Sequence, residues 1–304
     1  MATAVAVVVV SFNTRDLLRA CLESVRAELG GGSGELVVVD NASTDGSAGM
    51  VREEFPEARL LANDGNPGFG AAANQGLAAC RSPYAMLLNG DTWLRPGALA
   101  ALARYLDENP RAGIVGPRLL NPDGTLQPSC YPFLTPFNFL ALNSGLMYVV
   151  RFLRRFRPTY RGVPSRAGHW VKGAALAIRR EAFAAVAGFD EGYFMYAEEL
   201  DLCWRALAAG WEVHYTPVAS VVHVEGASTS QARHEMAALL FASLERFYRK
   251  HHRPASLSRL RRVVVLILLQ RIGRDVLKFW RYPERRPRLS GDLLLWRRLL
   301  LERL

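Results

Sequence analysis

Three groups of polar side chains in this 304-residue sequence could carry out metal or acid–base chemistry. Asn89-Gly90-Asp91 follows one apolar run, His223 follows another, and Glu198, Glu199 and Asp201 crowd a single short stretch. Carboxylates and imidazoles bind divalent cations. Clustered carboxylates repel one another, which raises a pKa towards the neutral range that suits a general base. The plainer interpretations of the same residues are a turn, a structural histidine and acids favoured by a helix dipole.

The segments that must position these groups alternate between strand and helix patterns. The apolar runs that predict strands are 5–11, 35–40, 58–63 and 84–91, and the helix patterns between them begin at Arg15, near Ser47 and near Gly70. Runs that are apolar throughout are typical of parallel strands covered by helices on both faces. We therefore predict an α/β fold with a mostly parallel, doubly wound sheet.

Three of these predicted strands end in polar residues: Ser11-Phe12-Asn13, Asp40-Asn41 and Asn89-Gly90-Asp91. The carboxyl ends of parallel strands meet at the edge where open α/β sheets bind ligands, so we expect all three to point into one crevice. The stretch DNASTDGS imitates the start of a calcium loop. The glutamate that such a loop needs, twelve positions from Asn41, is replaced by Arg52, which excludes calcium binding there.

The acidic group opens a predicted helix. Leu200, Cys203, Trp204 and Leu207 recur at helical spacing after Glu198, so the three acids fall in its first turn. A helix dipole accounts for one or two acids at this position. It does not account for three acids that follow an aromatic run.

A glycine-rich helix start offers a competing function. Residues 68–73, GFGAAA, satisfy the G-x-G-x-x-A fingerprint of dinucleotide-binding proteins, and Asp91 follows about 20 residues later. Such a fingerprint normally follows the first strand of its domain, whereas two βα units precede this one. An NAD-dependent Rossmann oxidoreductase is therefore one alternative, and close helix packing that needs small residues is another.

The net charge of +10 is unevenly distributed along the chain. Residues 1–245 hold 21 basic and 24 acidic residues, whereas residues 246–304 hold 17 basic and 4 acidic residues, a net charge of +13. Attraction to anionic partners therefore belongs to the C-terminal region, and we predict no nucleic-acid binding by the body of the protein. The four cysteines lie far apart without a CxxC pair, which argues against a zinc site or a disulfide framework.

The C-terminal region contains an amphipathic pattern at 261–281. Its basic side carries Arg271, Arg274, Lys278 and Arg281, and its apolar side carries Val265, Leu269, Ile272, Val276 and either Phe279 or Trp280. This pattern suits a helix that lies beside anionic lipid headgroups. Packing on the body of the protein, or on a second subunit in a homo-oligomer, is the alternative.

No stretch of the sequence approaches the roughly 20 apolar residues that span a bilayer. The amino end, MATAVAVVVVSFN, has neither a basic leader nor a small-residue cleavage site. We expect a cytoplasmic protein that is peripheral on the inner face of the cell membrane.

Seven segments, in their order along the chain, resemble family 2 glycosyltransferases of the rhamnosyltransferase-like branch: VVVSFN, VVVDNASTDGS, NPGFGAAANQG, LLNGDTW, GAALAIRR, GFDEGYFMYAEELDLCWR and VVHVEGAST. The resemblance covers about residues 4–230. It implies the GT-A fold, which binds nucleotide-diphosphate sugars, and inversion at the anomeric carbon. We expect a GT-A domain at 1–230, with 121–166 as an insertion or flexible acceptor-side loop, and a basic, helical, membrane-associating region at 231–304.

The same resemblance assigns roles to the strand ends. It places Asp40 against the nucleobase, and Asn89-Gly90-Asp91 on the family's D-x-D metal motif, with Asn89 in place of the first acid. This departure leaves Asp91 as the motif's charged ligand and gives more weight to His223, which matches the family's later metal-binding histidine. The implied cofactor is Mg²⁺ or Mn²⁺. The other donor-side residues are Ser11, Asn13, Asn41, Asn66, Gly70, Asn74, Asn89 and Gly90.

The catalytic and acceptor residues are also carried over from this resemblance. Glu199 matches the carboxylate that removes the proton of the acceptor hydroxyl, where the family more often has Asp, and Glu198 and Asp201 are the neighbouring candidates. The residues expected to face the acceptor are Trp170, Lys172 and Gly173. The implied donor is dTDP-rhamnose or another dTDP- or UDP-sugar, and the acceptor is a cell-envelope polysaccharide or a polyprenyl-linked glycan. A sugar-binding scaffold without turnover is the non-enzymatic alternative.

Overall fold

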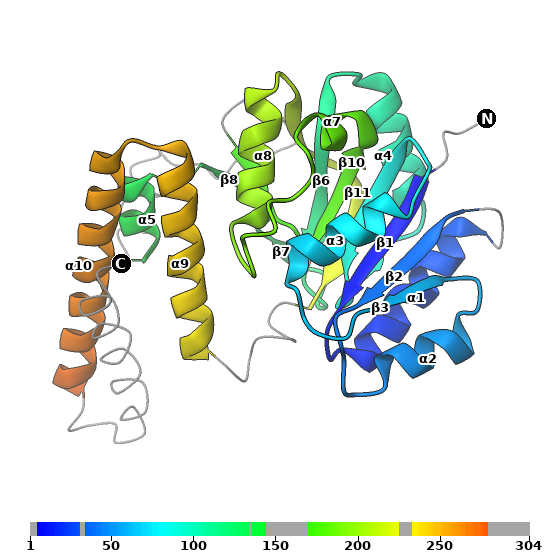
Figure 1. Ribbon diagram of the computed structural model, residues 1–304, viewed down its shortest axis with the longest axis horizontal. Helices are drawn as coiled ribbons and strands as arrows, with labels where there is room; N and C mark the ends of the chain where they lie inside the picture. The colour runs from blue at the N-terminus through cyan, green and yellow to red at the C-terminus, as the bar shows by residue number, and fades with distance from the viewer. Residues whose placement is uncertain (1–4, 31–33, 134, 144–168, 225–232, 279–304) are drawn as a thin grey trace. The chain divides into compact units, whose positions relative to one another are not determined.

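The computed structural model describes residues 5–30, 34–133, 135–143, 169–224 and 233–278 (Figure 1). The chain divides into two compact units. The first comprises Met1–Phe133 and Pro158–Gln231, and the second comprises Leu134–Arg157 and Ala232–Leu304. All predicted catalytic, donor, acceptor and metal residues belong to the first unit.

The first unit is built on a nine-stranded sheet. Its strands are β1 (Val5–Ser11), β2 (Leu36–Asp40), β3 (Arg59–Ala62), β4 (Tyr84–Asn89), β5 (Thr92–Leu94), β6 (Ala112–Leu120), β7 (Leu126–Gln127), β10 (Ala175–Arg179) and β11 (Glu212–His223). Their order is β3-β2-β1-β4-β10-β6-β11-β5, with β7 paired to β6. The strands β1 to β4 pair in parallel, as do β6 and β11, whereas β5, β7 and β10 are antiparallel to their neighbours. The predicted mostly parallel sheet is confirmed.

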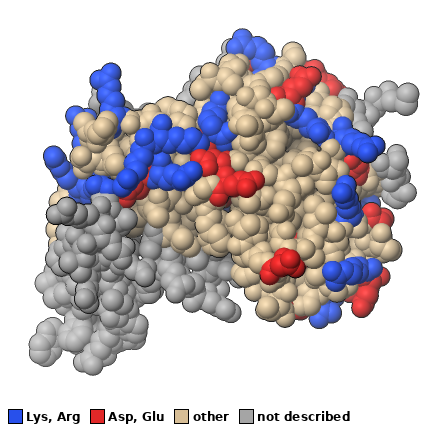
Figure 2. Space-filling model, in the orientation of Figure 1, with Lys and Arg blue, Asp and Glu red and all other residues tan. Residues whose placement is uncertain are grey.

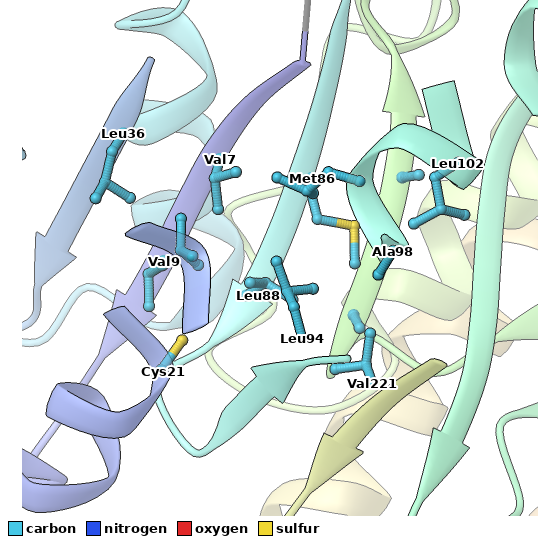
Figure 3. Close-up of a cluster of buried hydrophobic side chains, with 14 of the residues drawn as sticks. Val7, Val9, Cys21, Leu36, Met86, Leu88, Leu94, Ala98, Leu102 and Val221 are labelled. Atoms are coloured by element: carbon cyan, nitrogen blue, oxygen red, sulfur yellow. The ribbon is translucent and has the colours of Figure 1, made fainter. Parts of the chain in front are cut away.

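Helices cover both faces of this sheet, as Figure 1 shows for α1 and α2 on one face and α3 and α8 on the other. The helices of the first unit are α1 (Arg15–Leu29), α2 (Ser47–Glu54), α3 (Phe69–Ala78), α4 (Ala98–Glu108), α7 (Arg180–Ala185) and α8 (Glu198–Ala208). Successive strand residues point to opposite faces. Val7 and Val9 therefore join the core beneath α1, α2 and α4, while Val8 joins the core beneath α3 and α8. Figure 3 shows Val7 and Val9 in one cluster with Cys21 of α1 and Ala98 of α4. Burial on both faces explains why the strands read as continuous apolar runs.

The segment 121–166, predicted as an insertion or flexible loop, contains regular structure in its described part. Strand β7 extends the sheet at β6, β8 (Cys130–Pro132) pairs with β9 (His169–Val171), and α5 (Pro136–Asn143) belongs to the second unit. Residues 144–168 lie outside the described residues. The sequence suggested a loop because these elements, two to eight residues long, are too short to show a periodic pattern.

The described part of the second unit consists of α5, α9 (Arg233–His251) and α10 (Pro254–Lys278). Phe139 of α5 packs edge-to-face on Phe241 of α9, with 5.9 Å between ring centroids. Among residues 254–270 of α10, the buried apolar side chains are Leu260, Val264, Ile267 and Leu268. Their spacing of four, three and one residues defines one apolar face that packs within this unit.

This buried face differs from the apolar side predicted for the same helix. Val265 is only half-buried, and Leu269 is 48 % exposed. Leu266 is also exposed, at 55 %. Arg259, Arg262, Leu266 and Leu269 follow one another at helical spacing and form an exposed stripe along α10, which we call the basic stripe. Figure 2 shows Lys and Arg gathered over the turn between α9 and α10. The side chains predicted from Arg271 onward, on both sides of the helix, lie outside the described residues.

Among the helices in the described ranges, none combines the length and the hydropathy needed to cross a bilayer.

Candidate active site

The carboxyl ends of β1, β2 and β4 lie side by side because these strands pair in parallel. Ser11 is in register with Asp40, and the Gly90 N–H donates to the Val10 carbonyl at 2.9 Å. A Cβ on Gly90 would lie 3.2 Å from Ser11 Oγ and 3.0 Å from Thr14 Oγ1, so glycine permits the close approach of these turns. The expected convergence of the three strand ends thus follows from the register of the sheet.

Strand β10 brings further residues to this edge because it runs antiparallel to β4. The Asn89 N–H donates to the Ala174 carbonyl at 3.0 Å. The preceding residue, Gly173, donates its N–H to Glu199 Oε1 at 3.4 Å. A side chain on Gly173 would meet Glu199 at 3.5 Å. The start of α8 is therefore connected to the strand end that leads to Asp91.

Glu198 and Glu199 occupy the first turn of α8 in a desolvated environment. Oε2 of each carboxyl is buried without a hydrogen-bond partner among the described residues. Burial raises the pKa of Glu198 well above the usual glutamate value, and the charge of Glu199 adds to this effect. Burial also raises the pKa of Glu199, but nearby backbone N–H groups, including that of Gly173, and the charge of Lys172 oppose the shift. Glu199 is therefore the better stabilised carboxylate of the pair, as a general base requires.

The backbone that leads into α8 is strained. Tyr196 (φ 68°) and Ala197 (φ 62°) adopt the left-handed region, which costs roughly 1–2 kcal/mol for a non-glycine residue. The nearby Phe194 carbonyl accepts the N–H of Phe69 at 3.2 Å, which ties this segment to the start of α3. Strain of this kind concentrates at functional sites, and here it directly precedes the two glutamates.

Asp201, the third predicted catalytic candidate, lies in a different environment. It is 0 % exposed, and its oxygens accept from Arg205 Nε at 2.6 Å and from the Tyr193 hydroxyl at 3.3 Å. Arg205 also donates to the Val186 carbonyl. The structure thus gives Asp201 an ion pair within α8 at i,i+4 spacing, and the bonds of this pair to Tyr193 and Val186 hold α8 to the preceding segment.

Asp91 and His223 lie beside each other at the end of β11. Asp91 Oδ1 is 3.6 Å from His223 Nε2, and the Val224 N–H donates to the Asp91 carbonyl at 2.9 Å. The two side chains are only 8 % and 6 % exposed, respectively. Their separation exceeds a hydrogen bond and is close to the roughly 3 Å between neighbouring ligands of an octahedral ion with 2.1 Å bonds. A carboxylate oxygen and an imidazole nitrogen at this spacing fit two positions of one divalent ion.

No group of three or more His, Cys, Asp or Glu side chains comes together as a metal site within the described ranges. Sequence reasoning missed Gln127, whose Oε1 lies 2.7 Å from His223 Nδ1. Gln127 was hidden because it lies in the segment predicted as a loop.

One carboxylate oxygen of Asp40 is bound by the loop that follows β2, and the other is not. The Ser43 N–H donates to Asp40 Oδ1 at 3.0 Å, and Oδ2 is buried without a hydrogen-bond partner among the described residues. Asn13 fixes this loop, since its Oδ1 accepts the Thr44 N–H at 2.8 Å and its N–H donates to Ser43 Oγ at 2.9 Å. Asp40 Oδ2 is therefore available to accept a hydrogen bond from a ligand.

Asn41 and Asn66 belong to an amide network below this edge. Asn41 Nδ2 donates to Asn66 Oδ1 and to the Gly68 carbonyl, each at 3.3 Å. Asn63, which sequence reasoning missed, donates to Asn41 Oδ1 at 3.0 Å. These contacts fix the loop after β3 against the end of β2. The two predicted donor residues, Asn41 and Asn66, hold this loop in place by the hydrogen bond between them.

Gly70 and Asn74, predicted on the donor side, contact the loop before α8. A Cβ on Gly70 would lie 3.2 Å from Phe189 Cβ. Asn74 Oδ1 accepts the Phe189 N–H at 2.9 Å, and its Nδ2 donates to the Phe189 carbonyl at 3.0 Å and to Glu191 Oε1 at 2.9 Å. The structure therefore uses both residues to join α3 to this loop.

The glycines of the dinucleotide-like stretch face the protein's own chain. A Cβ on Gly68 would lie 2.4 Å from the Phe194 carbonyl oxygen, and Gly70 packs on Phe189. In a dinucleotide fingerprint the glycines instead leave room for a pyrophosphate at the first strand of the domain. Close packing against the protein's own chain explains these small residues. The motif therefore gives no reason to predict NAD binding.

The predicted acceptor residues lie on one segment that begins at β9. Trp170 stacks on Tyr131 with 5.0 Å between ring centroids and 26° between ring planes. Nδ1 of His169 and Nε1 of Trp170 are buried without hydrogen-bond partners among the described residues. The Lys172 N–H donates to the Ser129 carbonyl at 2.9 Å, and Gly173 contacts Glu199. The stacked pair and Lys172 therefore lie just before Gly173, where this segment contacts Glu199.

Residues 6–183 match the sequence family described as Glycosyl transferase family 2. The N-acetylglucosaminyl-diphospho-decaprenol L-rhamnosyltransferase of Mycobacterium tuberculosis is 32 % identical over 209 residues, which cover 64 % of this chain and 68 % of that protein. The pre-mycofactocin glycosyltransferase of the same organism is 31 % identical over 193 residues, which cover 62 % of this chain and 37 % of that protein.

Two solved structures share the fold at low sequence identity. The mannosyltransferase PcManGT from Pyrobaculum calidifontis, in complex with GDP-Man and Mn²⁺, superposes with a TM-score of 0.56 and 18 % identity, covering 99 % of this chain and 88 % of that chain. GalNAc-T7, with UDP, GalNAc and Mn²⁺, superposes with a TM-score of 0.54 and 17 % identity, covering 81 % of this chain and 50 % of that chain.

Proposed function

This chain belongs to glycosyl transferase family 2 and is a glycosyltransferase, and we propose that it transfers a sugar with inversion from a nucleotide-diphosphate donor to an acceptor hydroxyl. The observation that carries the proposal is the connection from Glu199 through Gly173 and Ala174 to Asn89. It joins a carboxylate with a raised pKa to the strand end that leads to Asp91. A base and a donor-phosphate site must be close neighbours for in-line displacement.

In the proposed reaction Glu199 is the general base. Its carboxylate takes the proton of the acceptor hydroxyl while the hydroxyl oxygen forms a bond to the anomeric carbon. The bond from that carbon to the nucleoside diphosphate breaks, and the diphosphate leaves with the electron pair. The raised pKa supports this role because a base works best when its pKa approaches the operating pH.

Asp91 and His223 are the residues that would hold a divalent cation, either Mg²⁺ or Mn²⁺. When bound, such an ion neutralises charge on the departing diphosphate. The carboxylate and imidazole at 3.6 Å support this assignment, and so do the Mn²⁺ ions named in the two solved relatives. The amide of Asn89 lies at the position of the family's first acid and keeps an oxygen, Oδ1, that is buried without a hydrogen-bond partner among the described residues.

The donor proposed is dTDP-rhamnose, with other dTDP- or UDP-sugars as the next candidates. The support is the 32 % identity to a protein named as an L-rhamnosyltransferase. Asp40 is assigned to the nucleobase, because its buried Oδ2 can accept from a ring N–H. Ser11, Asn13 and Gly90 line the same edge as supporting residues.

The acceptor proposed is a glycan carried on a polyprenyl diphosphate or in a cell-envelope polysaccharide. The name of the mycobacterial relative describes an acceptor of the first kind. The pair of Trp170 and Tyr131 supports a sugar acceptor, because aromatic faces pack against the apolar faces of sugar rings. Lys172 would attract an anionic group on the same acceptor.

A thermal-shift screen with nucleotide sugars and Mn²⁺ tests the donor assignment. We expect dTDP-rhamnose to raise Tm by roughly 5 °C at 100 times its Kd, since binding at that excess adds about 2.7 kcal/mol. GDP-mannose serves as the mismatched nucleotide control. A shift with NADH in the absence of metal would instead support the oxidoreductase alternative, and turnover of donor above background distinguishes an enzyme from a sugar-binding scaffold.

We propose that the exposed basic stripe of the second unit binds anionic membrane surfaces, where a lipid-linked acceptor is found. Full-length protein is expected to co-sediment with phosphatidylserine vesicles, and less so as salt rises. The exposed Arg253 lies between α9 and α10, next to the stripe. Replacing Arg253, Arg259 and Arg262 together with Gln is expected to weaken binding by roughly 100-fold, at about 1 kcal/mol for each charge. The exposed Leu266 and Leu269 support insertion of the same stripe into the interface.

The matched control replaces three exposed arginines of the first unit, Arg52, Arg81 and Arg104, with Gln. Substitution is preferable to truncation near Tyr248, because that residue and Phe247 are buried in α9. Equal losses in both triple variants would contradict a membrane role specific to the stripe. Equal binding to neutral and anionic vesicles would contradict an electrostatic attraction, and binding to neither would favour the oligomer alternative for the exposed leucines.

A further inference from the structure

Gln127, the last residue of β7, joins His223 to the hairpin between β6 and β7. Its side chain is 2 % exposed. Its Oε1 lies 2.7 Å from His223 Nδ1, while its Nε2 donates to the His223 carbonyl at 3.3 Å and to Asn121 Oδ1 at 2.9 Å. One amide therefore contacts both the ring and the backbone of the same histidine.

The direction of these hydrogen bonds is set by groups that only accept. Because the His223 carbonyl only accepts, Gln127 must turn its NH₂ group towards it and its oxygen towards Nδ1. An amide oxygen also only accepts, so Nδ1 must carry a proton. A neutral imidazole has one N–H, which leaves Nε2 with a lone pair at 3.6 Å from Asp91 Oδ1.

The hydrogen bonds in the turn between β6 and β7 run in the same donor-to-acceptor direction. Asn121 Nδ2 donates to Thr125 Oγ1 at 2.9 Å, and the Thr125 hydroxyl donates to Asp123 Oδ1 at 2.6 Å. The hydroxyl and backbone N–H of Thr125 lower the pKa of Asp123, which keeps this carboxylate ionised and accepting. Donation thus runs in four consecutive steps from the His223 ring, through Gln127, to a fixed negative charge. Such chains strengthen their members cooperatively.

We propose that Gln127 is a positioning residue that selects the Nδ1–H tautomer of His223 and so presents Nε2 beside Asp91 as a ligand for a divalent cation. The tautomer follows from the hydrogen bonds, whereas the role of the cation rests on the proposed function. Outer partners of a ligating histidine fix its tautomer and ring orientation, and their loss typically lowers metal affinity by roughly 10–100-fold.

The tautomer can be measured without any metal. Histidine ring nitrogen-15 spectra of the full-length protein, recorded at about pH 8 where an ordinary histidine is neutral, report which nitrogen carries the proton. The signal of His223 is assigned by its absence in His223→Ala. We expect Nδ1–H in the unsubstituted protein. A proton on Nε2 would overturn the proposal.

The consequence for metal binding is measured with Mn²⁺ alone, by electron paramagnetic resonance titration of three variants. Gln127→Met keeps the chain length but removes the acceptor, and is expected to weaken Mn²⁺ binding by roughly 10–100-fold. Gln127→Glu keeps an acceptor for Nδ1–H but loses the two donated bonds, and should retain the affinity. Asn121→Ala leaves Gln127 Oε1 in place and serves as the stability control.

A merely structural Gln127 predicts a different pattern. In that case the loss of Mn²⁺ affinity would follow the loss in Tm across all three variants, and Gln127→Glu would be as weak as Gln127→Met. Either result contradicts the positioning role. Nδ1–H on His223 in an unsubstituted protein that binds no Mn²⁺ would support the tautomer assignment and refute the proposed metal site instead.

Discussion

Replacing Glu199 with Gln is expected to reduce turnover by about 10²–10⁴-fold, the range of general base catalysis, while leaving donor affinity unchanged. The amide keeps the length of the side chain and can still meet the Gly173 N–H, which lies 3.4 Å from Glu199 Oε1. It cannot accept a proton from the acceptor hydroxyl. Initial rates with donor and acceptor, together with calorimetric titration of the donor, separate the two effects.

The neighbouring acids supply the controls. Glu198→Gln should retain most of the activity, because burial and the charge of Glu199 raise the pKa of Glu198, which favours the uncharged form that an amide resembles. Asp201→Asn should lose stability, because it breaks a buried ion pair with Arg205. Normal turnover by Glu199→Gln together with an inactive Glu198→Gln would show that the base is the adjacent residue.

The raised pKa of Glu198 should make the stability of the protein depend on pH. A carboxyl whose folded pKa is raised binds a proton in the native state that the unfolded chain has already released. The contribution of this carboxyl to the stability of the native protein therefore falls as pH rises from the unfolded pKa of about 4.3 towards the folded value. Glu198→Gln removes this pH-dependent loss of stability. The gain in Tm of the variant over the unsubstituted protein should therefore be larger at neutral pH than at pH 4.

Much of the fold could be predicted because its signals are local. The continuous apolar run 5–11 reports burial on both faces of β1, and the polar ends of β1, β2 and β4 mark the edge to which we assign the active site. The antiparallel insertion of β10 between β4 and β6 could not be predicted, since a five-residue run such as Ala175–Arg179 has no local signal for its partners. That insertion nevertheless brings Gly173 to the site.

Residue type alone could not separate functional side chains from structural ones. Glu198, Glu199 and Asp201 are equivalent as a pattern of acids, but Asp201 faces an arginine that lies four positions later in the helix. Asn74 and Asn41 are alike as amides, yet Asn74 pairs with the backbone of Phe189 across 115 residues. Such differences depend on partners distant in sequence, which only the folded chain brings together.

The second large effect is expected from Asp91→Asn, which should lower both Mn²⁺ affinity and metal-dependent turnover. Losing a charged ligand should cost more than the roughly 10–100-fold of an outer partner, and turnover should fall by about 10³-fold, which corresponds to roughly 4 kcal/mol of lost charge stabilisation. The fold should survive, because the amide matches the carboxylate in shape and the Asp91 carbonyl keeps its bond to Val224. Mn²⁺ titration and initial rates measure the two losses.

His223→Ala is the companion variant, since Asp91 and His223 are assigned to one ion. Their effects should be strongly non-additive, because once one ligand is lost the other has less to contribute. Asp16→Asn makes the same chemical change at an exposed carboxylate, whose side chain is 90 % exposed, and should leave both measurements unchanged. Unaltered Mn²⁺ affinity and turnover in Asp91→Asn would show that the strand end is an ordinary turn, as Asn-Gly-Asp also allows. Loss of turnover with Mn²⁺ affinity intact would instead assign Asp91 to direct contact with the donor.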